Sequence, residues 1–420
     1  MAKIDDSVKK KVPELRFPGF TDDWEERKFF ESIASTIDFR GRTPKKLGMD
    51  WSDSGYLALS ALNVKNGYID PLADAHYGDE KLYRKWMSGR ELKKGQVLFT
   101  TEAPMGNVAQ VPDDNGYILS QRTVAFETKE DMMTNDFLAV LLKSPLVFNN
   151  LSALSSGGTA KGVSQKSLKG LSITVPLDID EQQKIGSFFK QLDNSIALHQ
   201  RKLDLLKEQK KGYLQKMFPK NGEKVPELRF AGFADDWEER KLGDYIIQYS
   251  EKTKQNNQYP VFTSSRNGLF FQKDYYKGNQ IASEDNTGYN IVPRGYFTYR
   301  HMSDDLVFKF NINDLADYGI VSTLYPVFTT NEQLDSKYLQ YQLNEGSEFR
   351  RFSLLQKQGG SRTYMYLNKL QNMILTIPKL EEQQKIGSFF KQLDDTIALH
   401  QRKLDLLKEQ KKGFLQKMFV

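Results

Sequence analysis

The chain has 420 residues, of which 39% are hydrophobic, and it carries a formal net charge of +6 at pH 7. This length predicts two to three domains with real cores, and the mild basic excess fits a nucleic-acid partner without indicating one by itself. The absence of cysteine excludes disulfides and thiolate metal sites, and with only four histidines a catalytic zinc site is not expected.

No targeting or membrane-spanning segment is predicted. The first residues, MAKIDDSVKKKVPELRF, contain no apolar stretch of signal-peptide length, and no run approaches eighteen apolar residues. The lack of cysteine also suits a reducing compartment. We therefore expect a soluble, cytoplasmic protein with no membrane partner.

Two short segments, called here the frame segments, are almost the same. Residues 11–29 read KVPELRFPGFTDDWEERKF, and residues 224–242 repeat them with three changes in nineteen positions. The polar stretch 219–223 separates the two halves and has the composition of a linker. A period of about 200 residues is too long for a solenoid, so the chain is predicted to be a tandem duplication of one domain.

Each frame segment is followed by a variable segment, residues 30–175 and residues 243–377. The two share a skeleton of turn signals, with Asn-Gly pairs at 66–67 and 267–268, and Gly95 aligned on Gly295. Short strands with turn residues and a few helical stretches predict an α+β globule in each half. The fold is retained while the surface has diverged, which is the pattern of a scaffold presenting two different recognition surfaces.

A long helical segment closes each half. Residues 181–218 and 382–419 differ at only three positions, and their apolar residues recur at alternating steps of four and three, the seam of a coiled coil. Each segment would form a helix of about 57 Å. We expect the two helices to pack antiparallel along this seam, which contains Ile185, Phe189, Leu192, Ile196, His199, Leu203, Leu206, Ile386, Phe390, Leu393, Ile397, His400, Leu404 and Leu407.

No catalytic motif stands out. The sequence contains no phosphate-binding G-x-x-x-x-G-K-[ST] loop, no H-E-x-x-H and no G-x-G-x-x-G turn after a strand. The tetrapeptide typical of amino-methyltransferases, Asn/Asp-Pro-Pro-aromatic, is also absent. The chain is therefore predicted to be non-catalytic, with no metal site and no cofactor of its own.

The variable segments carry better signals for binding. Their loops mix basic, small polar and aromatic residues, which suits the neutralisation of phosphates and the reading of base edges in double-stranded DNA. The candidate DNA-binding residues are Arg40, Arg42, Lys45, Lys46, Arg84, Lys85, Arg90, Arg122, Thr159, Lys161, Ser264, Arg266, Asn267, Arg294, Arg300, Ser361, Arg362 and Tyr364.

The duplicated layout resembles the specificity subunit of type I restriction–modification systems. The resemblance rests on EQQKIGSFF, which opens both long segments, and on PELRF and DDWEERK, which open both halves, and it covers essentially the whole chain. It implies two target-recognition domains that each read one half of a split, asymmetric DNA site. The family has no short DNA-reading motif to carry over, so the candidate list rests on loop composition and repeat register.

The resemblance also implies partners. The long helices would be spacers that dock two modification subunits, which bind S-adenosylmethionine and methylate adenine, while separate restriction subunits use ATP and Mg to add cleavage. The corresponding domain boundaries are 1–29 for the first frame segment, 30–175 for target-recognition domain 1, 176–219 for the first spacer helix, 220–242 for the linker and second frame segment, 243–377 for target-recognition domain 2, and 378–420 for the second spacer helix.

Two other functions remain open at this point. The chain could be a coiled-coil adaptor whose globules bind proteins or glycans, which loss of all DNA affinity in the presence of partner subunits would favour. It could also be a nuclease or methyltransferase with an unrecognised site, which metal- or S-adenosylmethionine-dependent activity of the pure protein would reveal. The missing motifs make the enzyme the weaker alternative.

Overall fold

The computed structural model describes residues 12–155, 162–220, 223–278, 283–357 and 362–420. These residues form two compact units. Unit 1 contains the chain up to Gln200 together with Arg402–Val420, and unit 2 contains Arg201–Gln401. Each unit therefore combines one variable globule with the first part of one long helix and the last part of the other.

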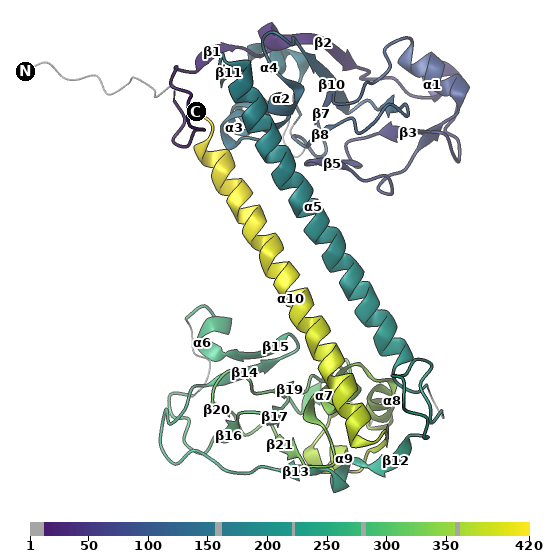
Figure 1. Ribbon diagram of the computed structural model, residues 1–420, viewed down its shortest axis with the longest axis vertical. Coiled ribbons are helices and arrows are strands. Elements are labelled where there is room, and N and C mark those ends of the chain that lie inside the picture. Colours follow the sequence, from purple (N-terminus) through teal and green to yellow (C-terminus); the bar gives the residue numbers. More distant parts are fainter. Residues whose placement is uncertain (1–11, 156–161, 221–222, 279–282, 358–361) are drawn as a thin grey trace, which may run out of the picture. The chain divides into compact units, whose positions relative to one another are not determined.

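Unit 1 is built on a four-stranded antiparallel sheet of order β2-β10-β7-β8, beside a three-stranded sheet of order β6-β3-β9. Figure 1 shows α2, α3 and α4 gathered around the start of α5. The elements of the globule are β1 (Glu25–Lys28), β2 (Ile33–Asp38), β3 (Tyr56–Leu59), β4 (Val64–Lys65), β5 (Tyr68–Ile69), β6 (Tyr77–Gly78), α1 (Glu80–Met87), β7 (Val97–Thr100), β8 (Val108–Gln110), β9 (Ile118–Leu119), β10 (Thr123–Thr128), α2 (Asn135–Leu141), α3 (Pro145–Leu154), α4 (Gln165–Gly170) and β11 (Ser172–Val175).

Unit 2 repeats the central sheet with the order β13-β21-β17-β19. Its helices α7, α8 and α9 gather around the start of α10 (Figure 1). The elements of the globule are β12 (Glu238–Lys241), β13 (Ile246–Gln248), β14 (Phe262–Ser265), β15 (Gly268–Phe271), α6 (Gln272–Tyr275), β16 (Asn290–Pro293), β17 (Phe297–Thr298), β18 (Met302–Ser303), β19 (Asn311–Ile312), β20 (Tyr318–Val321), β21 (Val327–Thr330), α7 (Ser336–Glu345), α8 (Ser347–Leu355), β22 (Thr363–Tyr364), α9 (Leu367–Gln371) and β23 (Ile374–Ile377).

The two globules share the skeleton that the sequence predicted. Val97 of β7 lies opposite Phe126 of β10, and Phe297 of β17 lies opposite Phe328 of β21. This pairing places residue 97 on residue 297, the same offset that aligns Gly95 with Gly295. The α+β class is confirmed for both halves.

One detail of the predicted alignment is wrong by a residue. In unit 1 the hairpin β4–β5 turns at Asn66-Gly67, because Lys65 pairs with Tyr68. In unit 2 the hairpin β14–β15 turns one residue earlier relative to its Asn-Gly pair, since Gly268 already belongs to β15 and pairs with Ser265. Both hairpins exist, but the turn in unit 2 presents Arg266 and Asn267 instead of Asn-Gly.

The long segments form two helices, α5 (Ile179–Lys216) and α10 (Leu380–Lys417). In unit 1, Phe188 contacts Phe414 and Asp193 pairs with Lys411, so the start of α5 runs antiparallel to the end of α10. In unit 2, Tyr213 near the end of α5 contacts Phe389 near the start of α10, so the two helices are antiparallel there as well.

The predicted seam is buried near the start of each helix and again past its middle, and the positions between these two stretches are half-buried. Ile185, Phe189, Leu203, Leu206, Ile386, Phe390, Leu404 and Leu407 are buried, whereas Leu192, Ile196, His199, Leu393, Ile397 and His400 are half-buried.

No single helix among the described ranges is long and apolar enough to cross a membrane. Helices α2 and α3 meet the length and composition only when taken together, and they are bent by 68° at their junction. All the apolar residues of α2 belong to the core of unit 1.

Candidate nucleic-acid interface

The frame segments hold the long helices against the globules. In unit 1, Arg16 donates two hydrogen bonds, of 2.7 and 2.8 Å, to the buried carboxylate of Glu181 in the first turn of α5. In unit 2, Arg229 makes the same pair with Glu382, at 2.7 Å for both bonds. The hydrogen bond to Glu181 raises the pKa of Arg16. The near-identity of the frame segments therefore has a structural cause, because each fixes the base of a helix.

The motif that opens both helices has the same purpose. Gln182 donates to the carbonyls of Pro176 and Met132, and it accepts from the amide of Thr134. Gly186 lies so close to α2 that a Cβ there would be 2.8 Å from the Cβ of Asp136. Glycine is required at this position because the start of α2 touches the helix backbone.

Aromatic side chains pack around the same helix base in each unit. Trp24 is buried and contacts Phe137 of α2 and Phe419, which follows α10. In unit 2, Trp237 contacts Phe218, which follows α5. Each globule is thus held by its own frame segment, by the helix that leaves it and by the end of the helix that returns to it.

Two of the predicted DNA-binding residues of unit 1 meet in one pocket of about 410 Å³. Arg40 and Arg122 both line it, together with Glu102, Gln121 and Gly162. Arg122 pairs with Glu102 at 3.2 Å, and both side chains are about half exposed, at 55% and 48%. Exposed ion pairs of this kind contribute little stability. Arg122 and Glu102 can therefore separate and contact a ligand instead.

Other basic residues of unit 1 are used within the protein. Arg42 donates to the carbonyl of Trp86, and its guanidinium lies 4.3 Å from the centre of the Phe39 ring, which Arg90 also contacts. Burial lowers the pKa of Arg42, with the charge of Arg90 adding to the effect. The remaining candidates are bound locally or exposed: Lys46 donates to Gly41, Lys85 donates to Leu47, Arg84 pairs with Glu80, and Lys45 is exposed.

In unit 2 four candidates line a single pocket of about 390 Å³, which also contains Tyr275 and Tyr276. They are Ser264, Arg266, Asn267 and Arg300. Ser264 is buried and its hydroxyl donates to the carbonyl of Thr298 at 3.2 Å, so it supports the hairpin. Arg266 forms a two-bond pair with Asp305, which lowers the pKa of that carboxyl to about 2.

The last candidates are scattered. Arg294 pairs with Asp317 beside β16 and β20, away from the pocket just described. Arg362 pairs with Asp304 at 2.9 Å, and Tyr364 is 37% exposed. Thr159, Lys161 and Ser361 lie outside the described residues.

One corner of each globule is built on the same backbone with different side chains. We define the unit 1 corner as Thr101, Glu102, Arg122 and Gly162, and the unit 2 corner as His301, Met302, Leu324, Tyr364 and Tyr366. Glu102 bridges to Gly162, as Met302 pairs with Tyr364. The amide of Val163 donates to the Thr101 carbonyl at 2.9 Å, as that of Met365 donates to the His301 carbonyl at 2.7 Å.

The first side chain of each corner also has an equivalent role. The hydroxyl of Thr101 donates to the carbonyl of Arg122 at 3.2 Å. The ring Nδ1 of His301 donates to the carbonyl of Leu324. Loop composition drew attention to the Arg300-His301 pair, but it did not single out Glu102, Leu324 or Tyr366. The offset of 200 that aligns Gly95 with Gly295, extended a few residues further, would have aligned Thr101 with His301 and Glu102 with Met302.

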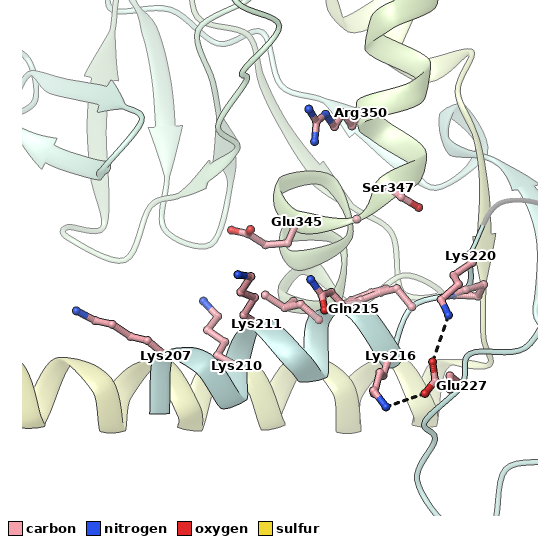
Figure 2. A pocket seen from close by; sticks show the side chains of 14 residues that line it. Lys207, Lys210, Lys211, Gln215, Lys216, Lys220, Glu227, Glu345, Ser347 and Arg350 are labelled. Atoms are coloured by element: carbon pink, nitrogen blue, oxygen red, sulfur yellow. Dashed lines mark hydrogen bonds and ion pairs between the residues drawn. The ribbon is translucent and has the colours of Figure 1, made fainter. Parts of the chain in front are cut away.

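A separate groove of about 720 Å³ lies in unit 2 between the end of α5 and the α7–α8 junction. Figure 2 shows Lys210 and Lys211 projecting from α5 toward the side on which Glu345 and Arg350 lie, while Lys207 extends away from them. The groove has two further cations, Lys216 and Lys220. Both pair with the carboxylate of Glu227, at 2.7 and 3.2 Å.

The charges of this lysine groove are only partly compensated. Lys210 pairs with Asp394 at 2.6 Å, and Glu345 is engaged by Lys309 at 3.1 Å. Within the described part of the chain no ion pair is recorded for Lys207, Lys211 or Arg350. The groove therefore favours an anionic group.

No cluster of three or more His, Asp or Glu side chains that could hold a metal ion occurs in the described ranges.

Comparison with known proteins places both halves in one family. The model of the type I restriction modification DNA specificity domain matches residues 22–208 and again residues 234–409. Two similar proteins, both from Methanocaldococcus jannaschii, are the type I restriction enzyme MjaVIII specificity subunit, 24% identical over 71% of this chain and 72% of the relative, and the MjaIX specificity subunit, 24% identical over 80% and 79%.

A solved structure has the same fold. The crystal structure of a type I restriction–modification S subunit from M. genitalium covers 97% of this chain and 99% of its own, with a TM-score of 0.62 at 13% identity.

Proposed function

Since the chain belongs to the type I restriction modification DNA specificity family, we propose that its two units read the two halves of one bipartite DNA target. The observation that carries the proposal is the pair of corners. Their backbones are equivalent, yet one presents an exposed ion pair and the other exposed aromatic rings. Two different readers on one repeated scaffold imply two different half-sites, so the target is not a palindrome.

In unit 1 the DNA contacts would come from Arg40 and Arg122, which share a pocket. In unit 2 they would come from Asn267 and Arg300 in the hairpin pocket and from Tyr364. Arginine and asparagine can bond guanine and adenine edges in the major groove. Lys45 and the other exposed cations would contact phosphates, which adds affinity without sequence preference.

The chain itself would not be catalytic. Two modification subunits would bind S-adenosylmethionine and methylate adenine, and restriction subunits using ATP and Mg would complete the system. Their docking face would be the outer side of the long helices. Each unit exposes one leucine from each helix there: Leu198 and Leu406 in unit 1, at 67% and 53%, and Leu205 and Leu399 in unit 2, at 52% and 64%. Exposed apolar side chains at equivalent positions suit a protein partner.

The test is to coexpress the chain with its modification subunits and to map adenine methylation across a genome. Residues 30–175 are then replaced by the corresponding segment of another specificity subunit. We expect methylation of a two-part motif of which only one half changes. The matched control replaces residues 243–377 and should change the other half. Absence of any sequence-specific methylation would contradict the proposal and favour a protein- or glycan-binding adaptor.

The docking face has its own test. Leu198→Ser with Leu399→Ser should weaken assembly with the modification subunits, measured by analytical ultracentrifugation, because these side chains are exposed at equivalent sites of the repeat. Lys207→Ser serves as the control, because this exposed residue lies nine residues, or about two and a half turns, after Leu198 and so on the other side of the helix. Unchanged assembly of the leucine variant would place the docking face elsewhere.

A further inference from the structure

The unit 2 corner is an ordered aromatic cluster at the surface. The rings of Tyr364 and Tyr366 stack at 5.9 Å with an angle of 12°, and His301 stacks on Tyr366 at 5.0 Å. His301 is only 6% exposed, whereas Tyr364, Tyr366 and Leu324 are exposed at 37%, 48% and 50%. Buried His301 therefore supports an apolar surface that faces outward.

Two backbone features hold Tyr364 and Tyr366 in place. Tyr364 lies in β22, opposite Met302 of β18. Tyr366 precedes α9, and between the two tyrosines Met365 is fully buried, with its carbonyl accepting from the hydroxyl of Tyr299 at 2.8 Å. Because alternate residues of an extended segment point the same way, burial of Met365 turns both tyrosines outward.

The unit 1 corner has the opposite chemistry. At the position of Leu324 it carries Arg122, at the position of Met302 it carries Glu102, and at the position of Tyr364 it carries Gly162. The glycine leaves the space that a tyrosine fills in unit 2. Arg40 lines the same pocket and pairs with Asp38 at 3.0 Å.

These two surfaces fit different base pairs. In the major groove, thymine is distinguished by its 5-methyl group, which apolar side chains contact. Guanine offers two acceptors that an arginine can bond together, and the amino group of its partner cytosine donates to carboxylates. An arginine beside a glutamate therefore matches a G·C pair, whereas exposed tyrosine and leucine match the methyl group of an A·T pair.

We propose that the unit 2 corner is a subsite for a thymine methyl group, formed by Tyr364, Tyr366 and Leu324, and that the unit 1 corner is a subsite for a G·C pair, formed by Arg122 and Glu102. The proposal rests on the DNA-reading function proposed above. His301 acts through the tyrosines as a positioning residue.

The experiment uses the complex of the chain with its modification subunits and duplexes of the mapped target. Each thymine in the half-site of unit 2 is replaced in turn by uracil, which lacks only the methyl group. One replacement should weaken binding about three- to tenfold in the native complex, as loss of one buried methyl contact predicts. For the variant that combines Tyr364→Ala, Tyr366→Ala and Leu324→Ala, which removes all three side chains of the subsite, thymine and uracil duplexes should bind equally.

The paired experiment addresses unit 1. Replacing one guanine of its half-site by 7-deazaguanine, which lacks one acceptor, should weaken binding about tenfold, and the penalty should vanish in Arg122→Ala. Arg122→Lys keeps the positive charge but loses the two-bond geometry, so it should lose the discrimination while retaining the salt dependence of binding.

Folding is controlled within each variant. Tyr364→Phe with Tyr366→Phe keeps the rings and should retain the thymine preference, and every variant should still discriminate at the half-site of the unaltered unit. The subsite proposal would be overturned by a uracil penalty that persists in the alanine variant, or by a unit 2 half-site without any methyl-sensitive thymine. Either result leaves sequence-specific methylation intact, whereas failure of the proposed function would abolish it.

Discussion

The two frame segments occupy equivalent places in the two units, and so do the two corners. These two kinds of region differ in how far their side chains are exposed. The frame pairs bury their carboxylates, with Glu181 and Glu382 at 0% and 1% exposure, and their contacts are the same in both units. The equivalent corner side chains Arg122 and Leu324 are exposed and dissimilar. A buried charged pair tolerates no change of one partner, whereas an exposed side chain costs little to replace. Burial therefore explains where the two halves have stayed alike.

The largest effect is expected from breaking a frame pair. Glu181→Ala leaves the largely buried Arg16 without its carboxylate and should lower the free energy of unfolding of unit 1 by about 3 kcal/mol. Hydrogen exchange of peptides from each unit, followed with increasing denaturant, measures the two units separately. Glu382→Ala should weaken unit 2 equally.

The exposed Glu208 on the same helix is the control, and its replacement by alanine should change stability by less than about 0.5 kcal/mol. Clearly unequal losses of unfolding free energy in Glu181→Ala and Glu382→Ala would show that the two frame segments are not equivalent.

A smaller loss should follow a change of the helix glycines. Gly186→Ala forces a Cβ to within 2.9 Å of the Phe137 amide nitrogen, so unit 1 should lose about 2 kcal/mol. Gly387→Ala should act alike in unit 2. Gly212→Ala, in the same helix as Gly186, meets no atom within 4 Å and should instead stabilise by up to about 1 kcal/mol. Thermal unfolding of the three variants measures the contrast, and a stabilising Gly186→Ala would contradict it.

The corners should differ from each other in a measurable way. His301→Ala removes a hydrogen bond and a stacked ring and should cost about 2 kcal/mol. Thr101→Ala removes only a hydrogen bond of 3.2 Å and should cost about 1 kcal/mol. Urea unfolding monitored by hydrogen exchange of each unit gives both values. Equal costs would show that stacking adds nothing to the unit 2 corner.

The smallest effect concerns the hairpin that presents Arg266. The hydrogen bonds from Arg266 and Ser303 hold the pKa of Asp305 at about 2, below its ordinary value of 3.8. A depressed pKa means that this contribution is present above pH 3.8 and is lost as the pH falls toward 2. A carboxyl NMR titration should show this midpoint, and Arg266→Ala should move it up toward 3.8. An unchanged midpoint in the variant would exclude Arg266 as the cause.

Much of the architecture follows from sequence patterns because repetition and periodicity can be read directly from the order of the residues. The seam from Ile185 to Leu206 was predicted from spacing alone, and the duplicated globules followed from aligned turns such as Gly95 and Gly295. The site was harder, since its members are brought together by pairing across distant segments. Glu102 meets Gly162 through a bridge, and His301 meets Tyr366 by stacking. Loop composition predicted Arg42 as a DNA contact because of its charge. Its guanidinium instead donates to the Trp86 carbonyl and lies over the Phe39 ring.

The contact between Trp24 and Phe419 has a consequence for the order of folding. Ribosomes make residue 419 after the whole of unit 2, so unit 2 has all its residues before unit 1 does. During synthesis, the apolar surface formed by Trp24, Phe137 and Phe189 lacks the ring of Phe419 that covers it in the finished protein. A contact between such distant residues forms late and leaves unit 1 open to aggregation while the chain is growing. The half that is made first is therefore completed last.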